Sequence, residues 1–424
     1  MKLPIFSTCI LLSILVAYQH ASAQCILVDG KLVQADGSPC ANTIITGLPF
    51  LRIVPDARFG GMGDAGIALS PDPNSMHFNA ANLAFSEKDL SVSATYTPWL
   101  RVLGLNDVFM AYLSSNLVLD AQKNRMQSLG MSLRFFSLGQ IQYTDEQGNA
   151  LQTVRPNELE LAFAYSRKLG KTFSIGFTPK YIFSNLGNGT GGGSQPMRPV
   201  HSFAADVAFA YRKPLKIGKS KNPNANLNFG LVFSNLGPKI SYTRSIDRDY
   251  IPANLGLGTS FSYAFDEHNS LTIAFDINKL LVPTPTAPTI QDENGNPVTN
   301  PEYDNENGDG TGDGEPDYKQ KSVPAAIFGS FGDAPGGIGE EFNELMYSIG
   351  LEYWYNKQFA IRLGHYNEHA TKGGRKFLTV GLGLRYNIFN INFSYLLPSF
   401  GAQRSPLDNT IRFSLLFDFD RLSD

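Results

Sequence analysis

Apolar and polar residues alternate with a period of two over most of the chain between residue 89 and the C-terminus. In the segment 159–165 every second residue is large and apolar, and the residues between them are Glu or Ala. The segments 378–386 and 411–419 repeat the pattern. A strand with one wide apolar face and one small or polar face suits a barrel wall with lipid outside and a polar lumen inside. The pattern predicts an all-β protein, an antiparallel transmembrane β-barrel.

Fourteen segments show this alternation, and each is close to the roughly ten residues with which a tilted strand crosses a membrane. They lie near 89–98, 107–119, 127–139, 157–168, 173–184, 201–212, 225–235, 252–264, 270–279, 343–355, 357–367, 375–387, 389–397 and 408–419. We therefore expect a 14-stranded barrel.

The predicted connections fall into two length classes. Some strands are joined by turns of a few residues, as at 167–171 and 386–388. The long links lie at 140–156, 185–200, 236–251, 280–342 and 398–407. In outer-membrane barrels short turns face the periplasm and long loops face the cell exterior, and we expect that orientation here. Aromatic residues near the predicted strand ends would form interfacial girdles: Tyr96, Trp99, Tyr181, Tyr211, Tyr263, Tyr353, Trp354 and Tyr395.

Composition supports a membrane barrel and argues against nucleic acid as a partner. Only 17% of the residues are charged, whereas 12% are aromatic and 40 are Gly. This combination is typical of outer-membrane barrels. The formal net charge of −3 provides no strong basic field for nucleic acid. No apolar run of about 18 residues follows residue 23, which excludes a helical membrane protein.

The first 23 residues predict export. Lys2, the apolar run 9–16 and the A-x-A sequence at Ala21–Ala23 match a secretory signal peptide that is cut after Ala23. An exported barrel is expected in the cell outer membrane, in contact with its lipid.

Two cysteines remain after removal of the signal peptide. Cys25 and Cys40 then lie in an oxidising compartment, and we predict a disulfide between them. We expect the segment that contains them, 24–46, to be periplasmic.

The stretch Gly61–Gly66 has the G-x-G-x-x-G spacing of a dinucleotide-binding loop. That function requires a strand before the glycines and a helix after them. Pro55 disfavours the strand, and the run Ser70–Pro73 leaves no room for a helix. We therefore interpret the glycines as positions where the backbone packs closely against other backbone.

The same stretch, followed by Asn79–Ala84, resembles the N-terminal hatch of the FadL family of outer-membrane barrels. That family shows G-x-G-x-A-G followed by N-P-A-x-L-A, and this chain has Ala80 in place of the proline. The resemblance implies that the segment 47–88 folds inside the barrel and blocks its lumen. The hatch residues that it identifies are Gly61, Gly63, Gly66, Asn79 and Asn82.

A narrower resemblance is to the PorV (LptO) family, the FadL-like barrels of the type IX secretion system. It is carried by the stretches 98–101, 133–139, 156–158, 164–169, 180–184 and 234–242. It implies a shuttle that binds the C-terminal domains of secreted cargo, takes the cargo from the SprA translocon and delivers it to a surface complex containing the sortase PorU. The alternative function is a FadL-like transporter of small hydrophobic molecules. We find no enzyme signature and expect no catalytic activity.

The segment 283–320 interrupts the barrel pattern with a polar, acidic loop. One hypothesis is a calcium site, because oxygen-bearing residues alternate with a glycine at the turn as in EF-hand-like loops. Its candidate ligands are Asn305, Asn307, Asp309, Asp313 and Asp317. The alternative is a flexible acidic surface loop.

The second hypothesis for the long link 280–342 is partner binding. By the same resemblance, a loop of this kind enters the lateral opening of SprA. The apolar, glycine-rich part 325–337 would supply packing surface, and the residues expected to contact a partner lie around Phe328, Phe331 and Ile338.

Overall fold

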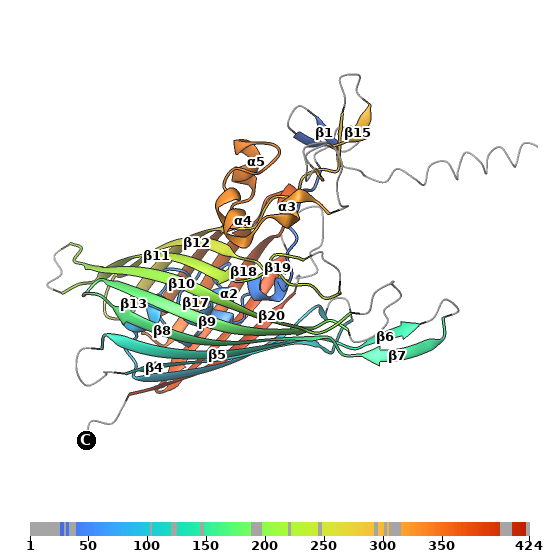
Figure 1. Ribbon diagram of the computed structural model, residues 1–424. Helices are drawn as coiled ribbons and strands as arrows, with labels where there is room; N and C mark the ends of the chain where they lie inside the picture. Colours follow the sequence, from blue (N-terminus) through green and yellow to red (C-terminus); the bar gives the residue numbers. More distant parts are fainter. Residues whose placement is uncertain are drawn as a thin grey trace, which may run out of the picture.

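Fourteen antiparallel strands close into a single barrel in the computed structural model (Figure 1). The model describes residues 26–28, 31–33, 40–101, 104–119, 125–144, 148–187, 197–218, 222–244, 248–291, 296–300, 303–304, 315–398 and 409–420. The barrel strands are β3 (Leu90–Pro98), β4 (Val108–Val118), β5 (Gln127–Leu138), β8 (Asn157–Lys168), β9 (Phe173–Asn185), β10 (Val200–Leu215), β11 (Ala225–Leu236), β12 (Asn254–Ala264), β13 (Asn269–Leu280), β16 (Met346–Tyr355), β17 (Phe359–Asn367), β18 (Lys376–Tyr386), β19 (Phe389–Pro398) and β20 (Ile411–Phe419).

Each barrel strand pairs with its neighbours along the chain, and β20 closes the ring by pairing with β3. The predicted 14-stranded barrel is therefore confirmed, and every predicted segment overlaps one strand with ends within three residues. Closure leaves no unpaired edge, as a sheet surrounded by lipid requires.

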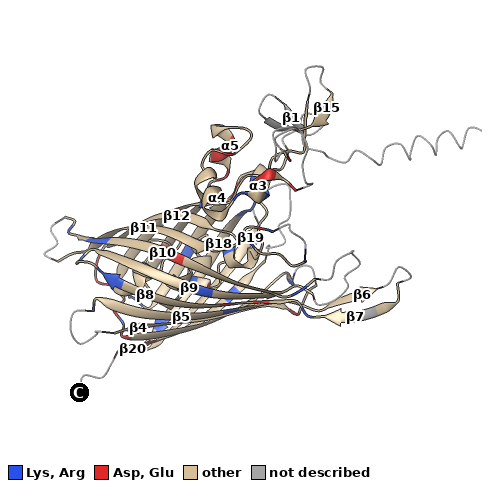
Figure 2. Ribbon diagram, viewed as in Figure 1, with Lys and Arg blue, Asp and Glu red and all other residues tan. Residues whose placement is uncertain are grey.

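The two faces of the wall differ as the alternation predicts. The outward face is apolar and carries few charged residues (Figure 2). Its exposed large side chains include Phe163, Phe177, Phe203, Phe229, Leu257, Ile361, Leu382 and Phe413. The inward positions are mostly Ser, Thr, Asn, Gly and paired charged residues, and they are buried. No helix among the described residues is both long and apolar enough to span a membrane.

Two of the predicted girdle residues are not on the outer surface. Trp99 is only 6% exposed and packs edge-on against Phe136 inside the barrel mouth. Trp354 occupies an inward position of β16, where Arg362 and Arg385 lie over its ring. The girdle prediction is therefore wrong for both tryptophans, because proximity to a strand end does not specify which face a side chain takes.

The interior is filled by the plug segment, residues 47–88. It consists of short helices: η1 (Pro49–Arg52), α2 (Ala57–Gly60), η2 (Pro73–His77) and η3 (Ala80–Phe85). Asp56, Asp72 and Asn79 cap the last three of these helices with side-chain hydrogen bonds to backbone N–H groups. Short capped helices suit a space in which each backbone group must find a partner.

The plug segment crosses the barrel from one end to the other. Leu48 and Phe50 pack with Ile240 and Ile251, at the end that carries the long loops. At the opposite end the ring of Phe85 lies against cations of β8 and β10, and the chain then enters β3.

The long loops contain regular structure that the alternation did not predict. The link after β5 forms a hairpin, β6 (Ile141–Thr144) and β7 (Ala150–Val154). The link after β13 contains β14 (Thr289–Gln291), β15 (Pro297–Thr299), α3 (Asp317–Gln320), α4 (Val323–Gly329) and α5 (Ile338–Asn343). Two N-terminal strands, β1 (Ile26–Val28) and β2 (Lys31–Val33), join β14 and β15 in a small sheet (Figure 1).

Two expectations from the sequence conflict in the structure. The sequence analysis placed residues 24–46 in the periplasm and the long loops outside the cell. The structure brings the two together, because the Asn42 amide hydrogen-bonds to the Pro285 carbonyl and the Asn42 N–H to the Thr371 carbonyl. Residues 40–46 therefore lie at the same end of the barrel as the long loops, and the side of the membrane that this end faces stays a prediction. A segment without strand periodicity gives no signal of the direction in which it crosses the barrel.

Candidate functional site

Glycines of the plug segment lie in direct contact with the inner wall. A Cβ atom on Gly63, whose φ is +67°, would overlap the backbone of His365 in β17. A Cβ atom on Gly61 would lie 3.1 Å from Cα of Gly381 in β18. On the wall, a Cβ atom on Gly364 would overlap the backbone of Gly63. Glycine on both sides therefore allows two backbones to touch, and this close packing accounts for the spacing that resembles a phosphate-binding loop.

The peptide group of Ile67 is held on both sides. The Asp276 carboxylate accepts hydrogen bonds from the backbone N–H of Gly66 at 2.6 Å and of Ile67 at 2.9 Å. The Ile67 carbonyl accepts from Nδ2 of Asn79 and from Nδ2 of Asn82, each at 3.0 Å. Asp276 thus fixes the glycine stretch to β13, and the asparagines singled out in the sequence hold that stretch to the following part of the plug.

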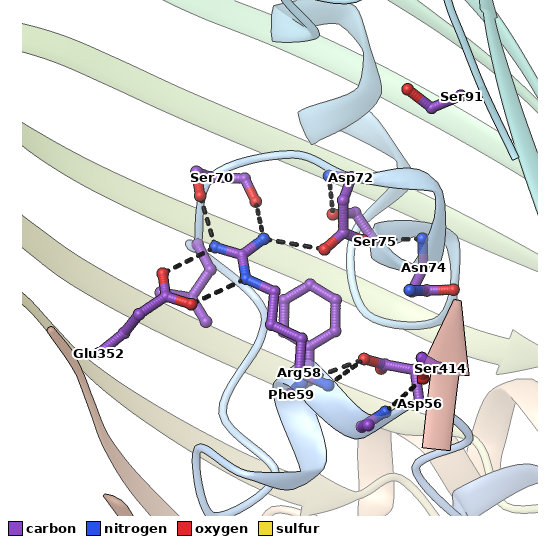
Figure 3. A network of polar contacts seen from close by, with 12 residues as sticks. Asp56, Arg58, Phe59, Ser70, Asp72, Asn74, Ser75, Ser91, Glu352 and Ser414 are labelled. Carbon is purple, nitrogen blue, oxygen red and sulfur yellow. Dashed lines mark hydrogen bonds and ion pairs between the residues drawn. The ribbon is translucent and has the colours of Figure 1, made fainter. Parts of the chain in front are cut away.

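A buried guanidinium connects the plug segment to β16 (Figure 3). Arg58 donates to both carboxylate oxygens of Glu352, at 3.1 and 3.0 Å, and to Asp72 at 2.8 Å. It also donates to the hydroxyl of Ser70 at 2.6 Å. On the wall, Arg362 donates to Glu352 at 2.7 Å. One carboxylate therefore pairs with two cations, one from the plug segment and one from the wall.

Arginines of the wall also donate hydrogen bonds to backbone carbonyls of the plug. Arg134 of β5 donates to the Phe50 carbonyl at 3.0 Å. Arg412 of β20 donates to the Val54 carbonyl at 3.2 Å. These contacts hold the outer half of the plug segment to two strands of the wall.

A cavity in the lumen is small, and its lining is mixed polar and apolar. A cavity of about 110 Å³ between plug and wall is lined by residues that include Arg52, Asp64, Lys180 and Arg375. An apolar groove of about 550 Å³ lies over β9–β13, but its side chains, among them Phe229, are on the outward face. Binding pockets for small apolar molecules are usually enclosed, apolar and roughly 300–1,000 Å³ in volume, and the lumen cavity lacks that character.

A second candidate site lies on the long loop after β13. We define the outer platform as residues 323–344, which include α4 and α5. Pro324 in the first turn of α4 has the fixed φ that begins a helix. Glu340 and Glu341 in the first turn of α5 favour that helix through its dipole. The platform lies at the long-loop end of the barrel, beyond the tips of β13 and β16 (Figure 1).

Buried ion pairs fix α5 to the barrel. Lys279 at the end of β13 bonds to Glu341 at 2.9 Å and to Glu344 at 2.5 Å. Lys372, in the loop between β17 and β18, bonds to Glu340 at 2.5 Å and to Glu344 at 3.0 Å. Because the cations come from two separate connections, α5 is held on two sides.

Four large apolar residues of the platform are exposed to solvent. Phe328 is 80% exposed and Ile338 is 77% exposed, and Phe331 and Phe342 are also exposed. The three residues expected to contact a partner therefore lie on one short, anchored segment, together with Phe342, which the sequence analysis missed. A cluster of exposed aromatic and aliphatic side chains outside the lipid marks an interaction surface.

The surroundings of Glu340 and Glu368 at this end favour the ionised form of both carboxyl groups. Burial by itself would raise the pKa of Glu340, but hydrogen bonds from Lys372 and Asn42 outweigh it and hold that pKa below its ordinary value. Burial opposes ionisation of Glu368 in the same way, and the hydrogen bonds and charge of Arg375 hold its pKa below the ordinary value.

Several predicted site residues lie outside the described residues. Four of the calcium candidates, Asn305, Asn307, Asp309 and Asp313, are among them, and Asp317 is the first residue of α3. The calcium site stays a prediction. Cys40 is disulfide-bonded, and its predicted partner Cys25 also lies outside the described residues, as does the predicted signal peptide.

The anchoring residues of the platform were not found from the sequence. Lys279 and Lys372 lie far from the acidic residues in the chain, and nothing local relates them. The i, i+4 spacing of Glu340 and Glu344 was the available signal, because it places two carboxylates on one helix face.

Comparison with known structures gives low similarity to toluene transporters. The toluene transporter TodX of Pseudomonas putida is 12% identical, with a TM-score of 0.46, over 89% of this chain and 98% of that one. The toluene transporter TbuX of Ralstonia pickettii is 11% identical, with a TM-score of 0.45, over 86% of this chain and 98% of that one. No curated protein matches the chain at a significant level. The assignment as a barrel rests on the strand pairing of this chain.

Comparison with protein families gives a definite result. The family described as "Type IX secretion system protein PorV" matches residues 37–287, more than half of the chain. The match includes the plug segment and the strands from β3 to β13, and it agrees with the resemblance drawn from the sequence. The chain therefore belongs to the PorV family of type IX secretion system proteins, and it is an outer-membrane β-barrel.

Proposed function

We propose that this protein is a shuttle of the type IX secretion system. It binds the C-terminal domains of secreted cargo, receives the cargo from the SprA translocon and delivers it to the cell-surface complex that contains a PorU-type sortase. The family supports a role in secretion, and the outer platform supplies a surface for a protein partner.

The main support for the proposal is the arrangement of side chains on the platform, where charged groups face the barrel and large apolar groups face solvent. Its charged residues, such as Glu344, are buried against the barrel, whereas Phe328 and Ile338 are exposed to solvent. Exposing aromatic side chains on a segment that is already fixed lowers the entropy that a partner loses on binding. Residues of this kind dominate the affinity of protein interfaces.

The alternative, a transporter of small hydrophobic molecules, needs an apolar path through the lumen. The plug segment is fixed to the wall by Glu352 and Asp276, and the cavity beside it is lined by charged residues. No observation on the described residues favours transport, and we keep the shuttle as the proposed function.

The experiment replaces Phe328, Phe331 and Phe342 by Ser in the full-length protein. We expect a folded barrel, judged by heat-modifiable migration in gels, together with a roughly tenfold or greater loss of cargo at the cell surface. Copurification with SprA and with cargo is measured in the same cells to identify which contact is lost.

The matched control replaces Leu105 and Ile141 by Ser, because these residues are also exposed and apolar on loops of the same end. Normal secretion by the platform variant, with its folded barrel present at ordinary levels, contradicts the proposal. Copurification of lipid, with no secreted protein, would instead favour the transporter.

A further inference from the structure

The segment 40–46 emerges from the plug at the long-loop end and lies on the outer surface. Its side chains alternate between buried and exposed, with Asn42 and Ile44 buried and Thr43 and Ile45 exposed. Ile45 is 79% exposed. This alternation is that of an extended strand whose inner face packs on the barrel.

The backbone N–H groups of this extended segment take only a limited part in hydrogen bonds. The Asn42 N–H donates to the Thr371 carbonyl, and the Gly47 N–H donates to the Tyr250 carbonyl. Among the hydrogen bonds of the described residues, none has the backbone N–H of residues 43–46 as its donor. Successive N–H groups of an extended chain point to opposite edges, so those of Thr43 and Ile45 share one edge. Unpaired N–H groups along a strand edge are a template for pairing with another strand.

A groove of about 410 Å³ runs beside this segment. Thr43 and Ile45 form one side, and the other side comes from the start of the long loop and from α3. Pro283, Pro285 and Pro288 line that opposite side, and a proline has no N–H with which to pair with an incoming chain. The backbone that offers donors to an occupant is therefore that of residues 43–46.

The groove is continuous with the outer platform. The Asn42 side chain donates to the Pro285 carbonyl at 3.1 Å and to Glu340 of α5 at 2.9 Å. Ile44 belongs to the same buried cluster as Ala326 of α4. A partner seated on the platform thus lies next to the groove.

We propose that this groove binds an extended segment of the secreted protein as an added β-strand along residues 43–46. The proposal rests on the proposed function, since it assigns the cargo as the partner. Main-chain hydrogen bonds would supply affinity that does not depend on the cargo sequence, as in β-strand addition. Thr43 and Ile45 would contact alternate side chains of the added strand.

The test measures amide hydrogen exchange of the full-length protein in detergent, with and without the purified C-terminal domain of a secreted substrate. We expect the amides of Thr43 and Ile45, which point to the same edge, to exchange freely alone and to become protected when that domain binds. Protection before the domain is added means that another part of this chain or a second copy occupies the groove, and it overturns the proposal.

Backbone variants separate strand addition from side-chain contact. Thr43→Pro and Ile45→Pro remove one N–H each and remain compatible with an extended chain. We expect each to weaken binding of the domain about tenfold, whereas Thr43→Ala and Ile45→Ala stay within about twofold. Binding without protection, or equal loss in the alanine variants, refutes strand addition and leaves the shuttle function standing. Absence of any binding by the wild-type protein refutes both.

Discussion

The plug segment and the outer platform are fixed to the same barrel by buried ion pairs. They differ in the exposure of their large apolar residues. In the plug, Phe59 and Met62 are fully buried against the wall. On the platform, Phe328 and Phe342 face solvent. The apolar side chains of the plug are thus covered by the wall, whereas those of the platform remain uncovered.

The two regions also differ in how closely they approach the barrel. The plug meets the wall backbone to backbone at Gly63 and Gly364, where no side chain fits. The platform is held through long side chains such as Lys372, and a Cβ atom on Gly339 of α5 would meet nothing within 4 Å. Changes in the plug should therefore affect the stability of the barrel, and changes on the platform should affect mainly its partners.

The largest effect is expected from Glu352→Gln. This change leaves Arg58 and Arg362 buried without their shared carboxylate, and breaking a buried ion pair from one side costs about 3–5 kcal/mol. The free energy of unfolding in urea, measured on protein reconstituted in lipid, tests it. Glu267→Gln, at an exposed residue in a short turn, is the control and should change little. Equal stability of the two variants would show that the plug is not held by this network.

A smaller loss is expected from Gly364→Ala. The added methyl group overlaps the backbone of Gly63, and overpacking costs about 1–3 kcal/mol. The same unfolding measurement applies, and Gly170→Ala is the matched control because its Cβ atom meets no other atom within 4 Å. Equal free energies of unfolding for both variants would show that the glycines do not serve to allow backbone contact between plug and wall.

The smallest effect is expected from pH on the platform. The pKa of Glu340 lies below its ordinary value of 4.5 in the folded protein. Its contribution is therefore fully present above that ordinary value, and it is lost as the pH falls through the lower folded pKa. A nitroxide on Gly339→Cys should stay immobile at neutral pH and gain mobility only in that acidic range.

Adding Glu340→Gln provides the control for this pH effect. Without the ionisable group, the acid-induced gain in mobility should shrink, while the barrel, followed by its migration in gels, stays folded. Mobility that rises already near neutral pH would contradict the anchoring by Glu340. The effect is the smallest of the three because the side chain keeps partial contact with water.

The strands were predictable because a barrel wall imposes one local rule. In segments such as 159–165 and 411–419, each residue faces lipid or lumen, so the sequence must alternate. The plug glycines were identifiable for a related reason, since Gly61 and Gly63 stand where only glycine permits backbone contact. The residues that would contact a partner were inferred from apolar character inside a polar loop, and Phe328 and Ile338 are indeed exposed.

The partners of these residues were not predictable, because they are brought together only by barrel closure. Glu352 lies nearly 300 positions from Arg58, and Lys372 approaches Glu340 from a different loop. The direction in which residues 40–46 leave the barrel was also decided by tertiary structure. An extended segment has the same local pattern at either end, and only its packing against Tyr250 and Thr371 places it at the long-loop end. The sequence by itself thus determined the wall and its inner and outer faces, whereas the packed structure decided what fills the barrel and which surface is left for a partner.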